Sequence, residues 1–165
     1  MQLVIDADGL IKLNRAGVLR WVIEAFDCII PSAVYSEVVT QGRARRYEDA
    51  EAIEAALTDK VQILSIEANP EPQLGLGIGE KGILNLLPRF PGSIVVSDDR
   101  RFLTVLSAEG IPFLTPADLL VVLTRREVLT GAQAREALEN LRPAIRTKAY
   151  WDARTDLGRQ LEGKS

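Results

Sequence analysis

Acidic residues follow two apolar segments of this chain, and their placement indicates a divalent-metal site. Asp6 and Asp8 come directly after one apolar run, and Asp98 and Asp99 come directly after another. Carboxylates that lie close together repel one another unless a cation lies among them. Carboxylate oxygens are also the ligands that hard ions such as Mg²⁺ prefer. A metal-dependent hydrolase site is therefore the chemistry that this pattern favours.

Two further acids lie in segments that begin with turn-forming residues. Glu37 lies in a segment entered through Ile30-Pro31-Ser32, and Glu80 directly follows Gly77-Ile78-Gly79. In an open parallel sheet the ligand cleft lies at the carboxyl ends of the strands, so acids placed there converge. Each acid could instead lie in the first turn of a helix, where the helix dipole favours a negative charge. The residues alone leave both interpretations open.

The composition excludes several other chemistries. The 165 residues include no histidine, which rules out catalytic triads and zinc sites that depend on imidazole. The single cysteine, Cys28, lies in an apolar run and is expected to be a small buried side chain. One cysteine cannot form an internal disulfide, which agrees with a reducing compartment. No apolar run approaches the ~18 residues of a membrane span. We therefore expect a cytoplasmic protein with no membrane partner.

Short apolar runs alternate with longer amphipathic segments along the chain. The apolar runs predict strands at residues 2–5, 27–30, 61–66, 93–96 and 111–114. Helices are expected at residues 8–14, 18–25, 31–40, 47–57, 78–87, 99–108, 116–124 and 131–141. This alternation predicts an α/β fold in which helices cover both faces of a central parallel sheet.

Turn-forming residues divide these elements. Pro31 and Ser32 are expected to begin a helix, with Ser32 as its cap. Residues 41–46 are expected to break that helix, because they contain glycine and a run of arginines. Residues 68–77 contain two prolines and two glycines and are expected to form a loop.

Four motifs, in order along the chain, resemble those of PIN domains. They are Val4-Ile5-Asp6-Ala7-Asp8, Ile30-Pro31-Ser32 followed by Glu37, Gly77-Ile78-Gly79-Glu80, and Val96-Ser97-Asp98-Asp99-Arg100. The resemblance is closest to the small prokaryotic PIN proteins related to VapC-type toxins. It implies a three-layer α/β/α fold and a Mg²⁺- or Mn²⁺-dependent endoribonuclease. We expect a PIN-like nuclease domain at residues 1–142 and a polar helical tail at residues 143–165.

The resemblance also implies which acids are catalytic. The acids that it assigns to catalysis and metal binding are Asp6, Glu37, Glu80, Asp98 and Asp99. Ser97 aligns with a threonine that is common in the family's fourth motif, which puts the principal ligand at Asp99 and makes Asp98 an additional acid. Asp8 stands where the family usually has asparagine or serine, so this site is expected to be more negative than most.

Polar residues near these acids are expected to contact the substrate. Ser97 would hold a carboxylate or a phosphate by a hydrogen bond, and Asp8 would be an alternate ligand or lie next to the ligands. Lys12 and Arg100 would contact phosphate groups. For each cation, a solvated surface position is the alternative. The cluster Arg43-Arg45-Arg46 is a further candidate for an RNA contact, through release of counterions from the RNA.

The leading hypothesis is a ribonuclease that acts as the toxin of a toxin–antitoxin pair. Its substrate would be RNA, its protein partner an antitoxin, and its oligomeric state, by resemblance, a homodimer. One alternative is a non-catalytic RNA- or protein-binding module with the same fold. Another is a Mg²⁺-dependent phosphatase or a DNA nuclease. Asp6-Ala7-Asp8 matches the first phosphatase motif, but the chain lacks the full downstream set.

Overall fold

A single parallel sheet organises the computed structural model, which describes residues 1–57, 59–66 and 75–163. Within these residues the strands are β1 (Gln2–Ile5), β2 (Asp27–Pro31), β3 (Val61–Leu64), β4 (Ile94–Val96) and β5 (Phe113–Leu114). Their order in the sheet is β3-β2-β1-β4-β5, and every neighbouring pair is parallel. The chain thus moves outward from β1 in both directions, and the order reverses between β1 and β4. Open α/β sheets bind ligands at such a switch point.

Helices connect the strands and extend beyond them. The helices of the sheet-containing part are α1 (Ala7–Arg15), α2 (Leu19–Ala25), α3 (Ser32–Tyr35), α4 (Gly42–Ala44), α5 (Glu48–Ala56), α6 (Ile78–Leu86) and α7 (Arg100–Ala108). A π-helical turn, η1 (Ser36–Gln41), joins α3 to α4, and a 3₁₀ turn, η2 (Leu87–Arg89), follows α6. The C-terminal part contains α8 (Pro116–Arg125), α9 (Gly131–Leu141), the 3₁₀ turn η3 (Arg142–Ala144) and α10 (Thr147–Glu162).

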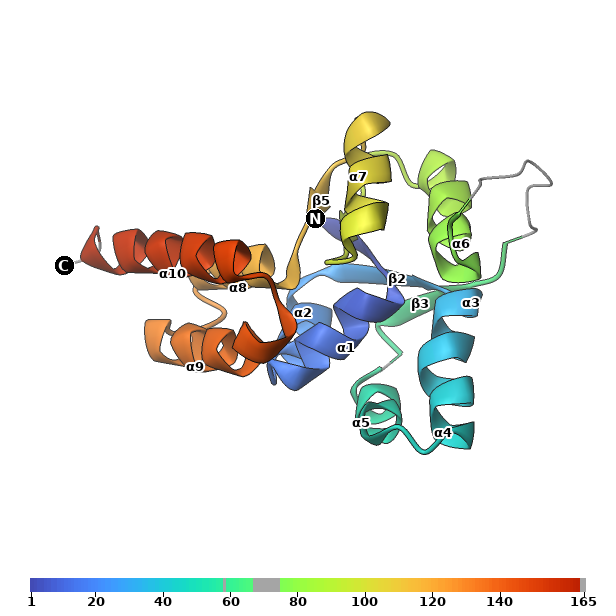
Figure 1. Cartoon of the computed structure of the whole chain (residues 1–165), viewed down its shortest axis with the longest axis horizontal. Coiled ribbons are helices and arrows are strands. Elements are labelled where there is room, and N and C mark those ends of the chain that lie inside the picture. Colours follow the sequence, from blue (N-terminus) through green and yellow to red (C-terminus); the bar gives the residue numbers. More distant parts are fainter. Residues whose placement is uncertain (58, 67–74, 164–165) are drawn as a thin grey trace.

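Successive residues of the central strands pack on opposite faces of the sheet. Leu3 and Ile5 of β1 belong to a core that includes residues of α1, α2, α5 and α8, whereas Val4 packs with residues of α6 and α7. Figure 1 shows α6 and α7 on one side of the sheet and α1, α2 and α5 on the other. Because both faces are covered, residues 3–5 of β1, 28–31 of β2 and 94–96 of β4 are all apolar. The predicted three-layer α/β/α fold is confirmed.

The helix after β2 begins differently from the prediction. Pro31 is the last residue of β2 and also occupies the N-cap position of α3, with no side-chain cap. Ser32 is therefore the first helical residue, and its predicted role as the cap was wrong.

The predicted break at residues 41–46 also starts too early. The helical segment continues through η1 and α4 as far as Ala44. Gly42 lies inside it because α4 packs closely against α5: a Cβ on Gly42 would be 3.0 Å from the Cβ of Ala50. The glycine is thus required by a helix–helix contact and does not end the helix.

Two strands are shorter than predicted. The strand predicted at 61–66 ends at Leu64, and the one predicted at 111–114 is reduced to Phe113–Leu114. Of the loop predicted at 68–77, residues 68–74 lie outside the described residues.

The C-terminal helix α10 packs against α8 and α9. Tyr150, Ala153 and Leu157 of α10 are buried in the same core as the sheet residues Leu3 and Ile5. None of the helices described is both long enough and apolar enough to cross a lipid bilayer.

Cys28, in β2, is buried as predicted, with 1% of its surface exposed. Burial, and to a lesser degree the nearby charge of Asp27, raises the pKa of the Cys28 thiol to about 12.

Candidate metal centre

Asp6 and Ser97 lie next to each other at the switch point of the sheet. Ile5 of β1 pairs with Val96 of β4, so the residues that follow them emerge side by side at the carboxyl ends of the two strands. The backbone N–H of Asp6 donates to the carbonyl oxygen of Val96 at 3.1 Å. Asp6 is 4% exposed and Ser97 is fully buried. A carboxylate thus enters the site from a position with little access to water.

Burial makes Asp6 an unusual acid. Its desolvation raises the pKa of Asp6 to about 7, against hydrogen bonds from the Ser97 hydroxyl and the Gly9 N–H, which lower the pKa. The nearby charges of Asp8 and Glu80 raise it further. Desolvation and the two nearby negative charges disfavour the ionised carboxylate, and a cation beside it would stabilise the ionised form. The electrostatics of Asp6 therefore favour a bound positive ion.

Gly9 allows the first turn of α1 to lie close to β4 and to the Asp6 carboxylate. The Gly9 N–H donates to Oδ1 of Asp6 at 2.6 Å, so Asp6 also caps α1. A Cβ on Gly9 would be 2.7 Å from the carbonyl oxygen of Val96 and 3.0 Å from Oδ1 of Asp6. The sequence interpretation missed Gly9, although a glycine three residues after the first acid was the available signal.

Ser97 links Asp6 to a second acid, Asp99. The hydroxyl oxygen of Ser97 accepts a hydrogen bond from the Asp99 N–H at 3.2 Å. Asp99 in turn caps α7, because its Oδ1 accepts from the Phe102 N–H at 2.9 Å. The predicted hydrogen-bonding role of Ser97 thus has a structural basis in contacts with both acids.

Glu80 and Glu37 come from two helical segments that pack against each other. Glu80 lies in the first turn of α6, and its Oε2 accepts from the Gly77 N–H at 2.6 Å. Glu37 lies in η1, and π-helical turns often occur at functional sites. A Cβ on Gly79 would be 2.9 Å from Cγ2 of Val34 and 3.5 Å from Oε2 of Glu37. Gly79 therefore permits the close approach that brings the two acids to one place.

These acids line one cavity of about 240 Å³, which we call the acidic cavity. Among the described residues that line it, five are acidic and none is basic. The lining residues are Asp6, Ala7, Asp8, Val34, Glu37, Gly77, Gly79, Glu80 and Asp99.

The orientation of the carboxylates explains what the cavity can do. Asp6, Glu80 and Asp99 each use one oxygen to accept a backbone N–H, and Asp6 also accepts from the Ser97 hydroxyl. A carboxylate has about four lone-pair sites, so each acid can still bind another partner. Among the described residues, no group of three or more acidic side chains has the arrangement of a complete metal site. Mg²⁺, however, keeps several of its waters and needs only one or two carboxylates as direct ligands. The all-oxygen donor set of the acidic cavity fits such an ion.

A comparison with protein families identifies the fold. A family model described as a PIN domain matches residues 2–151. The chain belongs to the PIN-domain family. PIN domains are generally nucleases that use divalent metal ions, so the acidic cavity lies in a fold of metal-dependent hydrolases. Comparisons with curated proteins and with solved structures give no match.

Asp98, predicted as an additional acid of the site, and Asp8, predicted as its neighbour, are both paired with a lysine. Nζ of Lys12 is 2.7 Å from Oδ2 of Asp98 and 2.9 Å from Oδ2 of Asp8. Burial lowers the pKa of Lys12, but the hydrogen bonds to Asp98 and Asp8 outweigh it, and the net pKa is raised. The Asp98 side chain is 2% exposed, and Nη2 of Arg146 lies 3.9 Å from its Oδ1. We call these four residues the Lys12 cluster.

The consecutive residues Asp98 and Asp99 belong to different groups of side chains. Asp99 lines the acidic cavity, whereas Asp98 does not. Lys12 and Arg100, both predicted to contact phosphate, also lie outside the cavity lining. Lys12 is held by its two carboxylates, and Arg100 is exposed in the first turn of α7. Asp8 belongs both to the cavity lining and to the cluster.

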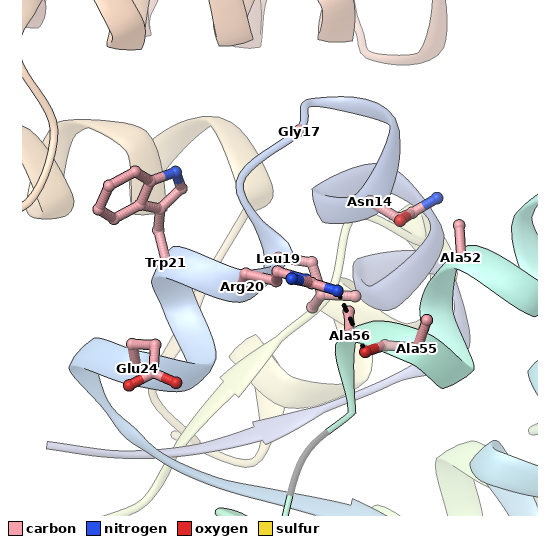
Figure 2. Close-up of a pocket in the computed structure, with 9 residues that line it drawn as sticks. All are labelled: Asn14, Gly17, Leu19, Arg20, Trp21, Glu24, Ala52, Ala55 and Ala56. Atoms are coloured by element: carbon pink, nitrogen blue, oxygen red, sulfur yellow. Dashed lines mark hydrogen bonds between the residues drawn. The ribbon is translucent and has the colours of Figure 1, made fainter.

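A larger hollow elsewhere in the PIN domain lacks this chemistry. It has a volume of about 570 Å³ and lies between α1, α2 and α5, where Figure 2 shows three alanines along one side. Arg20 crosses it to donate to the carbonyl oxygen of Ala55 at 3.4 Å. Its single acid, Glu24, pairs with Lys60. We call it the alanine hollow.

Proposed function

We propose that this PIN domain is a Mg²⁺- or Mn²⁺-dependent endoribonuclease whose metal is held by Asp6, Glu37, Glu80 and Asp99. One observation carries the proposal. These four acids come from four elements that are far apart in sequence, yet they line one cavity whose described lining contains no basic residue.

The four acids are proposed to bind the metal in two ways. Asp6 and Asp99 are the direct ligands, because Ser97 contacts both and fixes their relative orientation. Glu37 and Glu80 bind directly or through water. When bound, the ion supplies positive charge that stabilises the developing charge on the phosphate and lowers the pKa of an adjacent water.

The Lys12 cluster supports the metal site from outside the cavity. Lys12 neutralises Asp98 and Asp8 and so limits the negative charge next to Asp6 and Asp99. In this proposal Asp98 is a positioning residue, because it immediately precedes Asp99 and is anchored to α1 through Lys12.

Cleavage of labelled RNA, labelled DNA and a phosphate-ester reporter, with and without Mg²⁺, tests the function. We expect RNA alone to be cleaved, and only with the metal. Asp6→Asn and Asp99→Asn should abolish cleavage, whereas Glu24→Gln, at the alanine hollow, should not change it. Mn²⁺ binding measured by electron paramagnetic resonance gives a readout independent of activity and should weaken in the same two variants. Equal Mn²⁺ affinity in all four proteins would refute the ligand assignment.

We further propose that the protein acts in the cytoplasm as a homodimeric toxin restrained by an antitoxin. The support is the resemblance of its four motifs to those of VapC-type proteins. Induced expression in a bacterial host should arrest growth, and Asp6→Asn should relieve the arrest. Sedimentation velocity should show a dimer. Normal growth with active, soluble protein would contradict the toxin role and leave the nuclease proposal unaffected.

A further inference from the structure

A second opening lies beside the acidic cavity, and Glu37 lines both. This opening, which we call the arginine hollow, has a volume of about 570 Å³. Its lining comes from α1, η1, the turn after α4 and the start of α5, and includes Arg45, Arg46 and Tyr47. A ligand that occupied the acidic cavity could therefore continue past Glu37 into the arginine hollow.

The arginines of this region differ in their partners. Arg15 lines the hollow but is bound by Asp49, with Nε and Nη2 at 3.1 and 2.8 Å from Oδ2. Arg43 does not line the hollow and pairs with Glu54 at 2.8 Å.

Arg45 and Arg46 are exposed, and neither forms an ion pair with an acid of the described chain. Once Glu37 is committed to the metal and Asp49 to Arg15, the remaining acid of the lining is Glu48. The two arginines then outnumber it, so a bound metal strengthens the preference of the hollow for an anion. Without metal, Arg45 and Arg46 still form no ion pair with a described acid, so they remain available to phosphates.

The backbone holds an aromatic ring next to these two cations. Arg46 has a φ of 58°, a left-handed conformation that is uncommon for a residue other than glycine. The Tyr47 N–H closes this turn by donating to the carbonyl oxygen of Gly42 at 2.8 Å. Tyr47 remains 57% exposed at the hollow. An exposed ring beside unpaired arginines is the combination with which proteins bind single-stranded nucleic acid, by stacking and by phosphate contacts.

We propose that the arginine hollow binds the single-stranded RNA segment adjacent to the cleaved bond. A base stacks on Tyr47, and Arg45 and Arg46 contact the phosphates. The inference rests on the proposed function, which places the cleaved phosphodiester in the acidic cavity. It specifies a single strand, because stacking on a side chain requires a base that is not already stacked in a duplex.

Binding without metal tests this site separately from catalysis. Fluorescence anisotropy of a labelled single-stranded RNA in EDTA should show Tyr47→Ala weakening binding roughly five-fold or more, while Tyr47→Phe binds as the wild type. Arg45→Gln with Arg46→Gln should lower the salt dependence of log K by about 1.4, the value for two phosphate contacts on a single strand. Arg43→Gln is the matched control and should leave the salt dependence unchanged.

Cleavage assays separate the two proposals. The Tyr47→Ala and double arginine variants should cleave a longer single strand more slowly than the wild type, and the difference should be smaller for a dinucleotide, whose only phosphate is the one that is cleaved. If cleavage depends on Asp6 but these variants bind and cleave long RNA normally, the RNA path is wrong and the nuclease stands. If no substrate is cleaved but binding still depends on Tyr47, the nuclease is wrong and the binding site stands. Equal affinity for duplex and single strand would overturn the single-strand assignment.

Discussion

The acidic cavity and the Lys12 cluster lie at the same edge of the sheet, yet they balance negative charge in different ways. In the Lys12 cluster, α1 supplies a lysine between Asp8 and Asp98. In the acidic cavity no described lining residue is basic, and burial raises the pKa of Asp6 to about 7. An acid after a strand is thus structural where a side-chain cation reaches it, and a candidate metal ligand where none does.

The largest effect that would test this contrast is loss of catalysis on Asp6→Asn. The change removes a carboxylate from the cavity while keeping its size and its capping oxygen. We expect metal-dependent cleavage to fall roughly a hundred-fold or more, or about 3 kcal/mol of transition-state stabilisation. Initial rates on labelled RNA measure the loss, and circular dichroism checks that the fold persists. Undiminished cleavage would remove Asp6 from the metal site.

Asp6 should also make the metal-free protein less stable as the pH rises. Its pKa is about 7 in the folded protein against an ordinary value of 3.8, so the folded state keeps a proton that the unfolded chain releases. The stability from this proton is complete below the unfolded pKa and is lost as the pH rises through the folded pKa. Between about pH 5 and about pH 8 the loss should be roughly 2–3 kcal/mol.

Urea unfolding in EDTA measures this difference, and Asp6→Asn is the control because it cannot titrate. The wild type should lose more stability with pH than the variant, and Mn²⁺ should restore more stability at the higher pH. Parallel pH profiles for the two proteins would show that Asp6 does not carry the effect.

A smaller effect, on stability, is expected when the lysine of the Lys12 cluster is replaced. Lys12→Met leaves a carboxylate oxygen of buried Asp98 without its closest hydrogen-bond donor and should destabilise the fold by about 2 kcal/mol. The matched control is Lys148→Met, because Lys148 and Asp152 form an i,i+4 pair like that of Asp8 and Lys12 but lie on the surface. The control should cost less than about 1 kcal/mol. Similar urea midpoints for the two variants would mean that the Lys12 cluster does not stabilise the fold more than a surface ion pair does.

The smallest effect should come from the alanine hollow. Glu24→Gln breaks only an exposed ion pair with Lys60, so the unfolding free energy should change by less than about 1 kcal/mol. Mn²⁺ affinity should not change either. A clear loss of Mn²⁺ binding in this variant would place an additional metal ligand outside the acidic cavity.

The order of elements could be predicted from sequence because each central strand contains a short run of consecutive apolar residues. The strand order could not, since it depends on which side of β1 each connection crosses. Tertiary contacts also overrode the helix-breaking tendency that local sequence indicated. Gly42 looked like a helix breaker, but it lies inside a helical segment because Ala50 approaches it closely.

The candidate site, too, could be predicted from the sequence only in part. Asp6, Glu37 and Glu80 were assigned through the resemblance of their motifs to those of PIN domains, and the three side chains line one cavity. Spacing could not separate the contacts of Asp98 from those of Asp99. Consecutive residues at a helix start point in different directions, and the partner of Asp98 is a lysine 86 positions away in sequence.

The buried thiol of Cys28 gives the protein a practical property. A sulfur that stays protonated well above neutral pH reacts slowly with alkylating reagents. Cys28 is the only cysteine of the chain, so a cysteine introduced on the surface would be modified selectively. A fluorophore attached in this way next to the arginine hollow could report the arrival of a nucleic acid in real time, with no background from the native chain.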